Sequence, residues 1–262
     1  HIKEIQEGLE KNKAGFRRVP GTNLQNARKE IVYVPPQRFE DIQRHMENLV
    51  AYINDDTLSD VDPLIKLAII HHQFESIHPF YDGNSRTGRI INSLFLILKD
   101  LLDLPILYLS RYIIKNKADY YRLIQAVRDT NEWEQWILYI LKGVEETAEE
   151  TIILVKQINI LIQEYKIKMR KVLGRQYSHD LLNNIFKHPY TKIDFVMRDL
   201  HVSRVTATKY LNLMVSNNML NRIKMGKSNF YLNPELTQLF INHSENKNVD
   251  NFESIESIST II

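Results

Sequence analysis

The fold of this sequence is decided by one stretch, His78-Pro79-Phe80-Tyr81-Asp82-Gly83-Asn84-Ser85-Arg86-Thr87-Gly88-Arg89. The imidazole of His78 can accept a proton near neutral pH. The carboxylate of Asp82, four residues further on, is a hard oxygen ligand of the kind that holds Mg²⁺. This half of the stretch therefore supplies a general base and a candidate ligand for a cation.

The second half of the stretch predicts an anion-binding site. Gly83 to Ser85 lie where a loop enters a helix, and N–H groups at a helix start bind phosphate with help from the helix dipole. Arg86 and Arg89 are three residues apart, so they share one side of the first turn. Guanidinium groups pair well with phosphate oxygens. Together the twelve residues predict phosphoryl or nucleotidyl transfer.

The surrounding sequence has mainly helical periodicity. Apolar side chains recur at helical spacing from Phe39 to Ile53, and Pro63 begins a second predicted helix that covers residues 64–76. Further helices are predicted over residues 89–102 and 117–130, and residues 133–171 are predicted to form one or two long helices. Residues 19–24 and 30–34 are predicted to form a small hairpin, which ends before two prolines.

Composition indicates a globular chain with a real core. Of its 262 residues, 44% are hydrophobic and 25% are charged, and the net charge is +2. The absence of cysteine excludes disulfides and thiolate zinc sites and fits a reducing cytoplasm, where we expect the protein. The most apolar stretch, residues 90–109, contains three charges, so we expect it to be buried rather than in a membrane. Because the chain begins at His1 without an initiator methionine, we expect further residues upstream.

A second pattern begins after Gly174. Helices are predicted over residues 179–187, 193–200 and 203–217, followed by β-like runs at 220–224 and 229–232. This is the order of a winged helix. Residues 198–230 contain six basic residues and one acidic residue, a local charge of +5. Candidate DNA contacts are Arg204, Lys209 and Lys227; the alternatives are docking of a protein partner and formation of a homodimer.

The stretch from His78 to Arg89 resembles the motif of the Fic family, His-Pro-Phe-x-Asp/Glu-Gly-Asn-Gly-Arg-x-x-Arg, at eight of nine fixed positions. The resemblance extends over roughly residues 1–150, and a winged helix is a common C-terminal companion in one branch. It implies a mainly α fold. We expect a Fic helical core with a small β-hairpin flap over residues 1–150, a connecting helix at 151–174, a winged helix-turn-helix domain at 175–235 and a loosely structured tail at 236–262.

The resemblance also implies an activity, which is the transfer of AMP from ATP to a Thr, Tyr or Ser hydroxyl of a target protein. In this scheme His78 is the general base and Asp82 binds Mg²⁺. The implied nucleotide-binding and phosphate-binding residues are Asp82, Gly83, Asn84, Ser85, Arg86, Thr87, Gly88 and Arg89, with Tyr120 and Tyr121 bordering the adenine. The implied target-docking flap contains Gly21, Thr22, Asn23 and Leu24, which hold the target as an extended strand.

One position departs from the motif, since Ser85 stands where the family has a second glycine. A positive φ there would strain a non-glycine residue. Two other functions stay open: transfer of another phosphate-linked group such as phosphate, phosphocholine or UMP, and regulation by DNA binding with a vestigial catalytic core. Self-modification is a further candidate activity.

Family members often carry an inhibitory helix with the pattern Ser/Thr-x-x-x-Glu-Gly/Asn, whose glutamate pairs with the second motif arginine, here Arg89. Three Glu-Gly or Glu-Asn pairs occur, Glu7-Gly8, Glu47-Asn48 and Glu245-Asn246. They have Lys3, Gln43 and Ile241 at the Ser/Thr position, so none fits the pattern. We therefore expect this chain to lack self-inhibition and the inhibitory helix to lie upstream. Outside the motif, we expect His71 and His72 to be structural, because their spacing does not fit a zinc helix.

Overall fold

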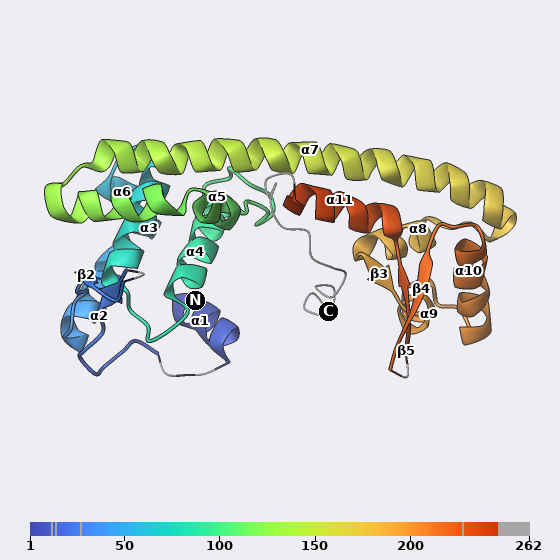
Figure 1. Cartoon of the computed structure of the whole chain (residues 1–262), viewed down its shortest axis with the longest axis horizontal. Helices are drawn as coiled ribbons and strands as arrows, with labels where there is room; N and C mark the ends of the chain where they lie inside the picture. Colours follow the sequence, from blue (N-terminus) through green and yellow to red (C-terminus); the bar gives the residue numbers. More distant parts are fainter. Residues whose placement is uncertain (12, 14, 27, 227, 246–262) are drawn as a thin grey trace. The chain divides into compact units, whose positions relative to one another are not determined.

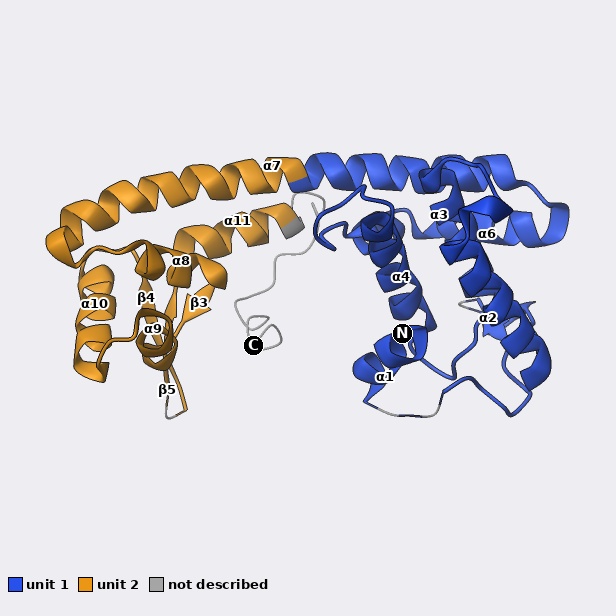
Figure 2. Ribbon diagram, turned by 180° about the vertical axis from the view of Figure 1, so that it is seen from behind, with its two compact units in different colours: residues 1–151 blue, residues 152–262 orange. Residues whose placement is uncertain are grey.

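The computed structural model describes residues 1–11, 13, 15–26, 28–226 and 228–245. The chain divides into two compact units, residues 1–151 and 152–262 (Figure 2). Helices dominate both units, and the sheets are small and antiparallel (Figure 1), which confirms the predicted fold class. In the described ranges no helix is long and apolar enough to cross a membrane.

Unit 1 is a set of helices around a buried apolar core. Its elements are α1 (Ile2–Glu10), β1 (Leu24–Gln25), β2 (Ile31–Tyr33), α2 (Phe39–Asn54), a short 3-10 turn η1 (Asp56–Leu58), α3 (Pro63–Ile77), α4 (Asn84–Leu98), α5 (Leu109–Lys115), α6 (Lys117–Thr130) and the first part of α7 (Trp133–Leu173). Helix α3 packs between α2 and α4, and α1 lies against α4 (Figure 1). Trp136 of α7 is fully buried in this core and donates from Nε1 to the carbonyl of Ala68 at 2.9 Å.

Unit 2 builds its core on the second part of α7. Its other elements are η2 (Gly174–Gln176), α8 (His179–Lys187), β3 (Tyr190–Thr191), α9 (Ile193–Leu200), α10 (Arg204–Ser216), β4 (Asn221–Met225), β5 (Ser228–Leu232) and α11 (Pro234–Glu245). The three strands form an antiparallel sheet in the order β3-β5-β4. Buried Tyr165 of α7 donates to the carbonyl of Met219 at 3.0 Å, which ties α7 to the end of α10.

Helix α4 is displaced along the sequence relative to the predicted helix at 89–102. It begins at Asn84 because Gly83, with φ of 79°, turns the chain into the helix. It ends at Leu98 because Asp100 adopts a left-handed conformation with φ of 54°. The N–H groups of Asp100 and Leu101 then donate back to the carbonyls of Ile97 and Leu96, which is a Schellman ending without glycine.

The prediction of a loose tail from residue 236 is wrong for its first part, where α11 extends to Glu245. Asn233 begins this helix, because its Oδ1 accepts from the N–H of Leu236 at 3.0 Å. Leu236 is buried in the core of unit 2. Residues 246–262, the rest of the predicted tail, lie outside the described residues. The predicted hairpin of unit 1 is present but shorter, with Leu24 opposite Tyr33.

Candidate active site

The motif forms the connection between two packed helices. His78 ends α3 in a left-handed conformation (φ 48°), and its N–H donates to the carbonyl of Phe74. Asn84, the first residue of α4, closes the loop because its side-chain amide makes two hydrogen bonds to the backbone of Phe80, at 2.9 and 2.8 Å. Phe80 itself is fully buried. Residues 78–83 are therefore held in one conformation at the point where α4 begins.

Arg17 braces the loop from outside the motif, and the sequence analysis missed it. Its side chain is fully buried, and its Nε donates to the carbonyl of His78 at 2.8 Å. Its guanidinium also donates to the carbonyl of Pro36, and its own N–H donates to the carbonyl of Pro79 at 2.9 Å. Arg17 is 61 residues away from His78 in the chain, so no local pattern could have revealed the contact.

His78 lies half-buried at the edge of this loop. Burial lowers the pKa of its imidazole to about 4, and the charge of Arg17 lowers that pKa further. The ring is therefore neutral at physiological pH, the form in which a histidine accepts a proton.

The N-terminus of α4 provides the predicted anion-binding groups. The first N–H groups of a helix have no acceptor within the helix, and here they follow Gly83. The N–H of Gly83 is already used, because it donates to Oδ1 of Asp82 at 2.7 Å. Asp82 is exposed beside this helix start, and Gln6 of α1 donates to its carbonyl at 3.4 Å.

A carboxylate from α1 occupies this helix start. Glu10 forms an ion pair with Arg86, the first motif arginine. The side chain of Glu10 is only 13% exposed. The same carboxylate packs so closely on Gly83 that a Cβ there would lie 2.7 Å from Glu10 Oε1. The sequence analysis missed Glu10, because its search was restricted to the Ser/Thr-x-x-x-Glu-Gly/Asn pattern and to Arg89.

Ser85 shows none of the strain that the sequence analysis considered. It lies in the first turn of α4, and the described residues with positive φ do not include it. Its hydroxyl donates to Oε2 of Glu75 at 3.4 Å. Glu75 is buried in α3, and burial raises the pKa of its carboxyl to about 7, against the opposing effect of the Arg89 and Arg128 charges. The serine thus adds a weak link between α4 and α3.

The remaining motif positions have different roles in the structure. Arg89 is half-buried, and its charge acts on both Glu75 and His71. Thr87 is fully buried, and its N–H donates to the carbonyl of Gly83. Gly88 faces α3 so closely that a Cβ would lie 3.0 Å from the ring of Phe74. Thr87 and Gly88 therefore serve helix packing in this structure, and their contact with phosphate stays a prediction.

The two candidate adenine-bordering tyrosines differ in exposure. Tyr120 is 7% exposed, and its hydroxyl lies 3.1 Å from Nε2 of His71, so it belongs to the core. His71 is also bonded to Asn92, at 3.0 Å, and both His71 and His72 are buried as expected. Tyr121 is 58% exposed and stays a candidate for contact with a nucleotide base.

The flap residues form a turn that is tied to the motif. The N–H of Gly21 donates to Oε1 of Gln37 at 2.7 Å, and Gln37 Nε2 donates to the carbonyl of Thr22 at 2.9 Å. Asn23 donates to the carbonyl of Gly21 at 3.3 Å, and Leu24 begins β1. The hydroxyl of Tyr81 accepts from the N–H groups of Arg18 and Val19, so the motif loop is bonded to the segment that leads into the flap.

The side chains of the site suit a cation that is bound mainly by the phosphates of a substrate. The described part of the chain has no group of three or more His, Cys, Asp or Glu residues that could hold a metal ion. Mg²⁺ is commonly bound by one or two carboxylates plus the phosphates of a substrate. A single exposed Asp82 beside the start of α4 fits that arrangement.

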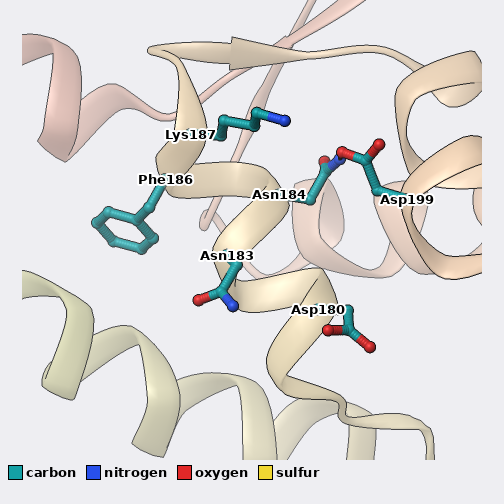
Figure 3. A pocket seen from close by; sticks show the side chains of 6 residues that line it. All are labelled: Asp180, Asn183, Asn184, Phe186, Lys187 and Asp199. Atoms are coloured by element: carbon teal, nitrogen blue, oxygen red, sulfur yellow. The ribbon is translucent and has the colours of Figure 1, made fainter.

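Unit 2 has a hollow beside α8 (Figure 3). It is lined by Asp180, Asn183, Asn184, Phe186, Lys187 and Asp199. The Asn184 amide donates to Asp199 at 2.9 Å and accepts from Thr191 at 2.6 Å, so its polar groups join α8 to its neighbours. The amide of Asn184 and the carboxylate of Asp199 are thus satisfied within unit 2, and their bonds serve packing.

Two family models match this chain. Residues 1–96 match the model of the Fic/DOC family. Residues 161–236 match a model described as protein adenylyltransferase SoFic-like, C-terminal domain. The chain therefore carries a Fic/DOC family domain. More particularly, that domain is joined in one chain to a C-terminal domain of the SoFic-like type.

Curated relatives match part of the chain. Protein adenylyltransferase fic-1 of Caenorhabditis elegans is 26% identical over 113 residues, which cover 43% of this chain and 21% of the relative. Protein adenylyltransferase Fic of Drosophila erecta is 24% identical over 135 residues, which cover 50% of this chain and 26% of the relative. The matched region thus spans about a fifth to a quarter of these relatives.

The fold has a counterpart among solved structures. A crystal structure of a Fic family protein from Desulfovibrio desulfuricans G20 aligns with a TM-score of 0.52 and 19% sequence identity. The alignment covers 88% of this chain and 67% of that one. At this level of identity the likeness supports the fold alone.

Proposed function

We propose that this chain is a protein adenylyltransferase that moves AMP from ATP to a hydroxyl side chain of a target protein. The observation that carries the proposal is the juxtaposition of a neutral histidine, His78, with a helix start that bears Asp82, Arg86 and Arg89. The names of the matched relatives support the same class of reaction.

The proposed reaction has a simple balance. The imidazole of His78 takes the proton from the target hydroxyl, whose oxygen attacks the α-phosphorus of ATP. A phosphorus–oxygen bond to AMP forms, the bond between the α- and β-phosphates breaks, and pyrophosphate leaves. A histidine with a pKa of about 4 is a weak base, but it is fully unprotonated at neutral pH and so always available for this step.

The other groups orient the nucleotide. The N–H groups at the start of α4 and the two arginines hold the phosphates, with Arg86 on the β- and γ-phosphates and Arg89 on the γ-phosphate. Asp82 would hold Mg²⁺, which neutralises charge on the phosphates and on the leaving pyrophosphate. Exposed Tyr121 is the remaining candidate for contact with the adenine.

The target is proposed to add to the flap as an extended strand. The β1–β2 hairpin has only two strands, and both leave an edge unpaired. Ile31 and Val32 of β2 are exposed, which gives the edge apolar side chains that a peptide would cover. Because Arg18 and Val19, which lead into the flap, are hydrogen-bonded to Tyr81 of the motif loop, we expect a peptide held on the flap to lie near that loop.

The test is incubation with α-labelled ATP, Mg²⁺ and cell lysate, followed by mass spectrometry of labelled proteins and of the chain itself. His78→Ala should reduce labelling by about 10²–10⁴-fold and leave ATP binding largely intact. His188→Ala, at an exposed histidine in unit 2, is the matched control. Equal labelling by His78→Ala and the parent would refute the mechanism.

The mass of the added group separates the other candidate donors. Addition of phosphate, phosphocholine or UMP in place of AMP would assign the chain to a different transfer reaction at the same site. No transfer from any of these donors, with ATP binding also absent, would favour a vestigial core.

A further inference from the structure

Helix α10 of unit 2 presents a polar and basic face to solvent. Val205, Lys209, Asn212 and Ser216 are all exposed and follow the helical spacing of four, three and four residues, so they form one stripe. The opposite side carries Ala207, Leu211 and Met214, which are buried in the core. The stripe is therefore fixed outward by the packing of the helix.

The charge of this face has one sign. The sequence of α10 contains Arg204 and Lys209 and no acidic residue. The neighbouring strand β4 has all five residues exposed and contributes Arg222 and Lys224, again without an acidic residue. Strands β4 and β5 pair as a hairpin that extends away from α7 (Figure 1). In the described residues the helix and the hairpin thus carry four basic side chains, and Lys227, the third predicted DNA contact, lies outside the described residues.

Two ion pairs lie at the border of this face, and their acidic residues do not neutralise its positive charge. Arg204 pairs with Asp194 of α9 at 2.9 Å, with both side chains more than 60% exposed. Arg198 pairs with Asp199 at 2.7 Å at the end of α9. Exposed pairs of this kind contribute little and exchange readily with another anion. A phosphate group can therefore replace Asp194 as the partner of Arg204.

The face of α10 has a single exposed apolar side chain, which fits contact with nucleic acid better than packing against an apolar protein surface. Val205, 80% exposed in the first turn of α10, is the most exposed large apolar side chain in the described part of the chain. The other residues of the exposed stripe, Lys209, Asn212 and Ser216, are all polar. Isolated methyl groups of this kind contact the thymine methyl, and Asn pairs with adenine, in the major groove.

We propose that unit 2 binds duplex DNA, with α10 in the major groove and the β4–β5 hairpin against the adjacent phosphate backbone. The major groove admits an α-helix, and in helix-turn-helix proteins the helix after the turn takes this place. Here the turn at His201, with φ of 54°, separates α9 from α10. The inference goes beyond the proposed transferase activity and needs no residue of unit 1.

The test is fluorescence anisotropy of the full chain with a labelled random-sequence duplex of about 20 base pairs, from about 50 to 300 mM salt. Affinity should fall steeply as salt rises, by about one unit of log–log slope for each phosphate contact. Lys209→Glu and Lys224→Glu should each weaken binding about tenfold or more and reduce the slope. Lys171→Glu, an equal charge change at an exposed residue of α7, is the matched control.

Val205→Ser tests the groove assignment separately. On a duplex selected from a random pool by the parent chain, this variant should lose preference for the selected sequence while its salt slope stays unchanged. No binding to duplex at about 50 mM salt would overturn the proposal. So would equal weakening by Lys171→Glu, or tighter binding of poly-glutamate than of duplex, which would indicate an acidic protein partner.

Discussion

Glu10 is expected to compete with the nucleotide for the start of α4. Its carboxylate pairs with Arg86 and packs on Gly83, the place where the proposed mechanism puts the β- and γ-phosphates. ATP must displace this carboxylate before its phosphates can enter, and like charges would otherwise lie within contact distance. Glu10→Gln, which keeps the size of the side chain and removes its charge, should therefore strengthen ATP binding.

The magnitude follows from the burial of the pair. A charge-assisted hydrogen bond contributes about 1.5–3 kcal/mol, and the 51% exposure of the Arg86 side chain reduces this to about 1–2 kcal/mol through solvent screening. Since 1.4 kcal/mol corresponds to a factor of ten, the Kd for ATP should fall by about 5- to 30-fold. Glu10→Asp keeps the charge but shortens the side chain, so it should give an intermediate effect.

The assay is isothermal titration calorimetry with Mg²⁺ and a non-hydrolysable ATP analogue. Glu4→Gln is the control, since Glu4 lies on the same helix but pairs with His1. If Glu10→Gln and Glu4→Gln bind the analogue equally, the carboxylate does not compete. If Glu10→Gln binds more weakly than the parent, Glu10 instead holds Arg86 ready for the phosphate.

Three further outcomes are expected. Asp82→Ala should remove the Mg²⁺ dependence of labelling together with most of the activity. The control Asp103→Ala should change neither. If Asp82→Ala still responds to Mg²⁺, another residue must bind the ion. Ser85→Ala should lower the free energy of unfolding by no more than about 1 kcal/mol, since the hydrogen bond from Ser85 to Glu75 is long. It should change labelling only a few-fold. A large loss of labelling would mean that the hydroxyl contacts the phosphates. The melting temperature should fall between about pH 6.5 and pH 4, because the unfolded chain binds protons that the folded chain does not. Burial lowers the pKa of three histidines to about 3 or 4: His71, His72 and His78. The pKa of Glu75 is raised to about 7, so this carboxyl binds a proton more readily in the folded chain and partly offsets the histidines. The free energy of unfolding should therefore change by up to about 3 kcal/mol per pH unit. A melting temperature that does not change over this range would contradict the neutral state of the buried rings.

The sequence predicted the helices whose signals are local. Residues 117–130 and the start of the long helix at Trp133 are as predicted, because apolar spacing and flanking polar residues define them. The apolar periodicity misplaced the start of α4 at residue 89, whereas the motif had placed a helix start at Gly83 to Ser85, where the helix begins. Its end was misplaced because Asp100 takes a left-handed conformation that is usually assigned to glycine.

The candidate site was predictable in its chemistry and not in its surroundings. The twelve motif residues are contiguous, so their shared loop and helix start could be inferred from spacing alone. Glu10 and Arg17 reach the motif across 76 and 61 residues of chain, and neither belongs to a recognisable pattern. The packing roles of Thr87 and Gly88 depend on which side of α4 faces α3, and that is fixed by tertiary packing that no local pattern encodes.

The two motif arginines are compensated by carboxylates of different kinds, and this difference locates the control of the site. Glu75 lies inside the α3–α4 pair, and because burial raises the pKa of its carboxyl to about 7, much of its charge near Arg89 is removed by protonation. Glu10 comes from α1, outside that pair, and forms an ion pair with Arg86. The charge near Arg89 can therefore change by proton transfer without any movement of the backbone, whereas the partner of Arg86 can leave only if α1 or the Glu10 side chain moves. A partner or target that displaces α1 would release Arg86, the first motif arginine, and not Arg89, where the family pattern had placed the expected control.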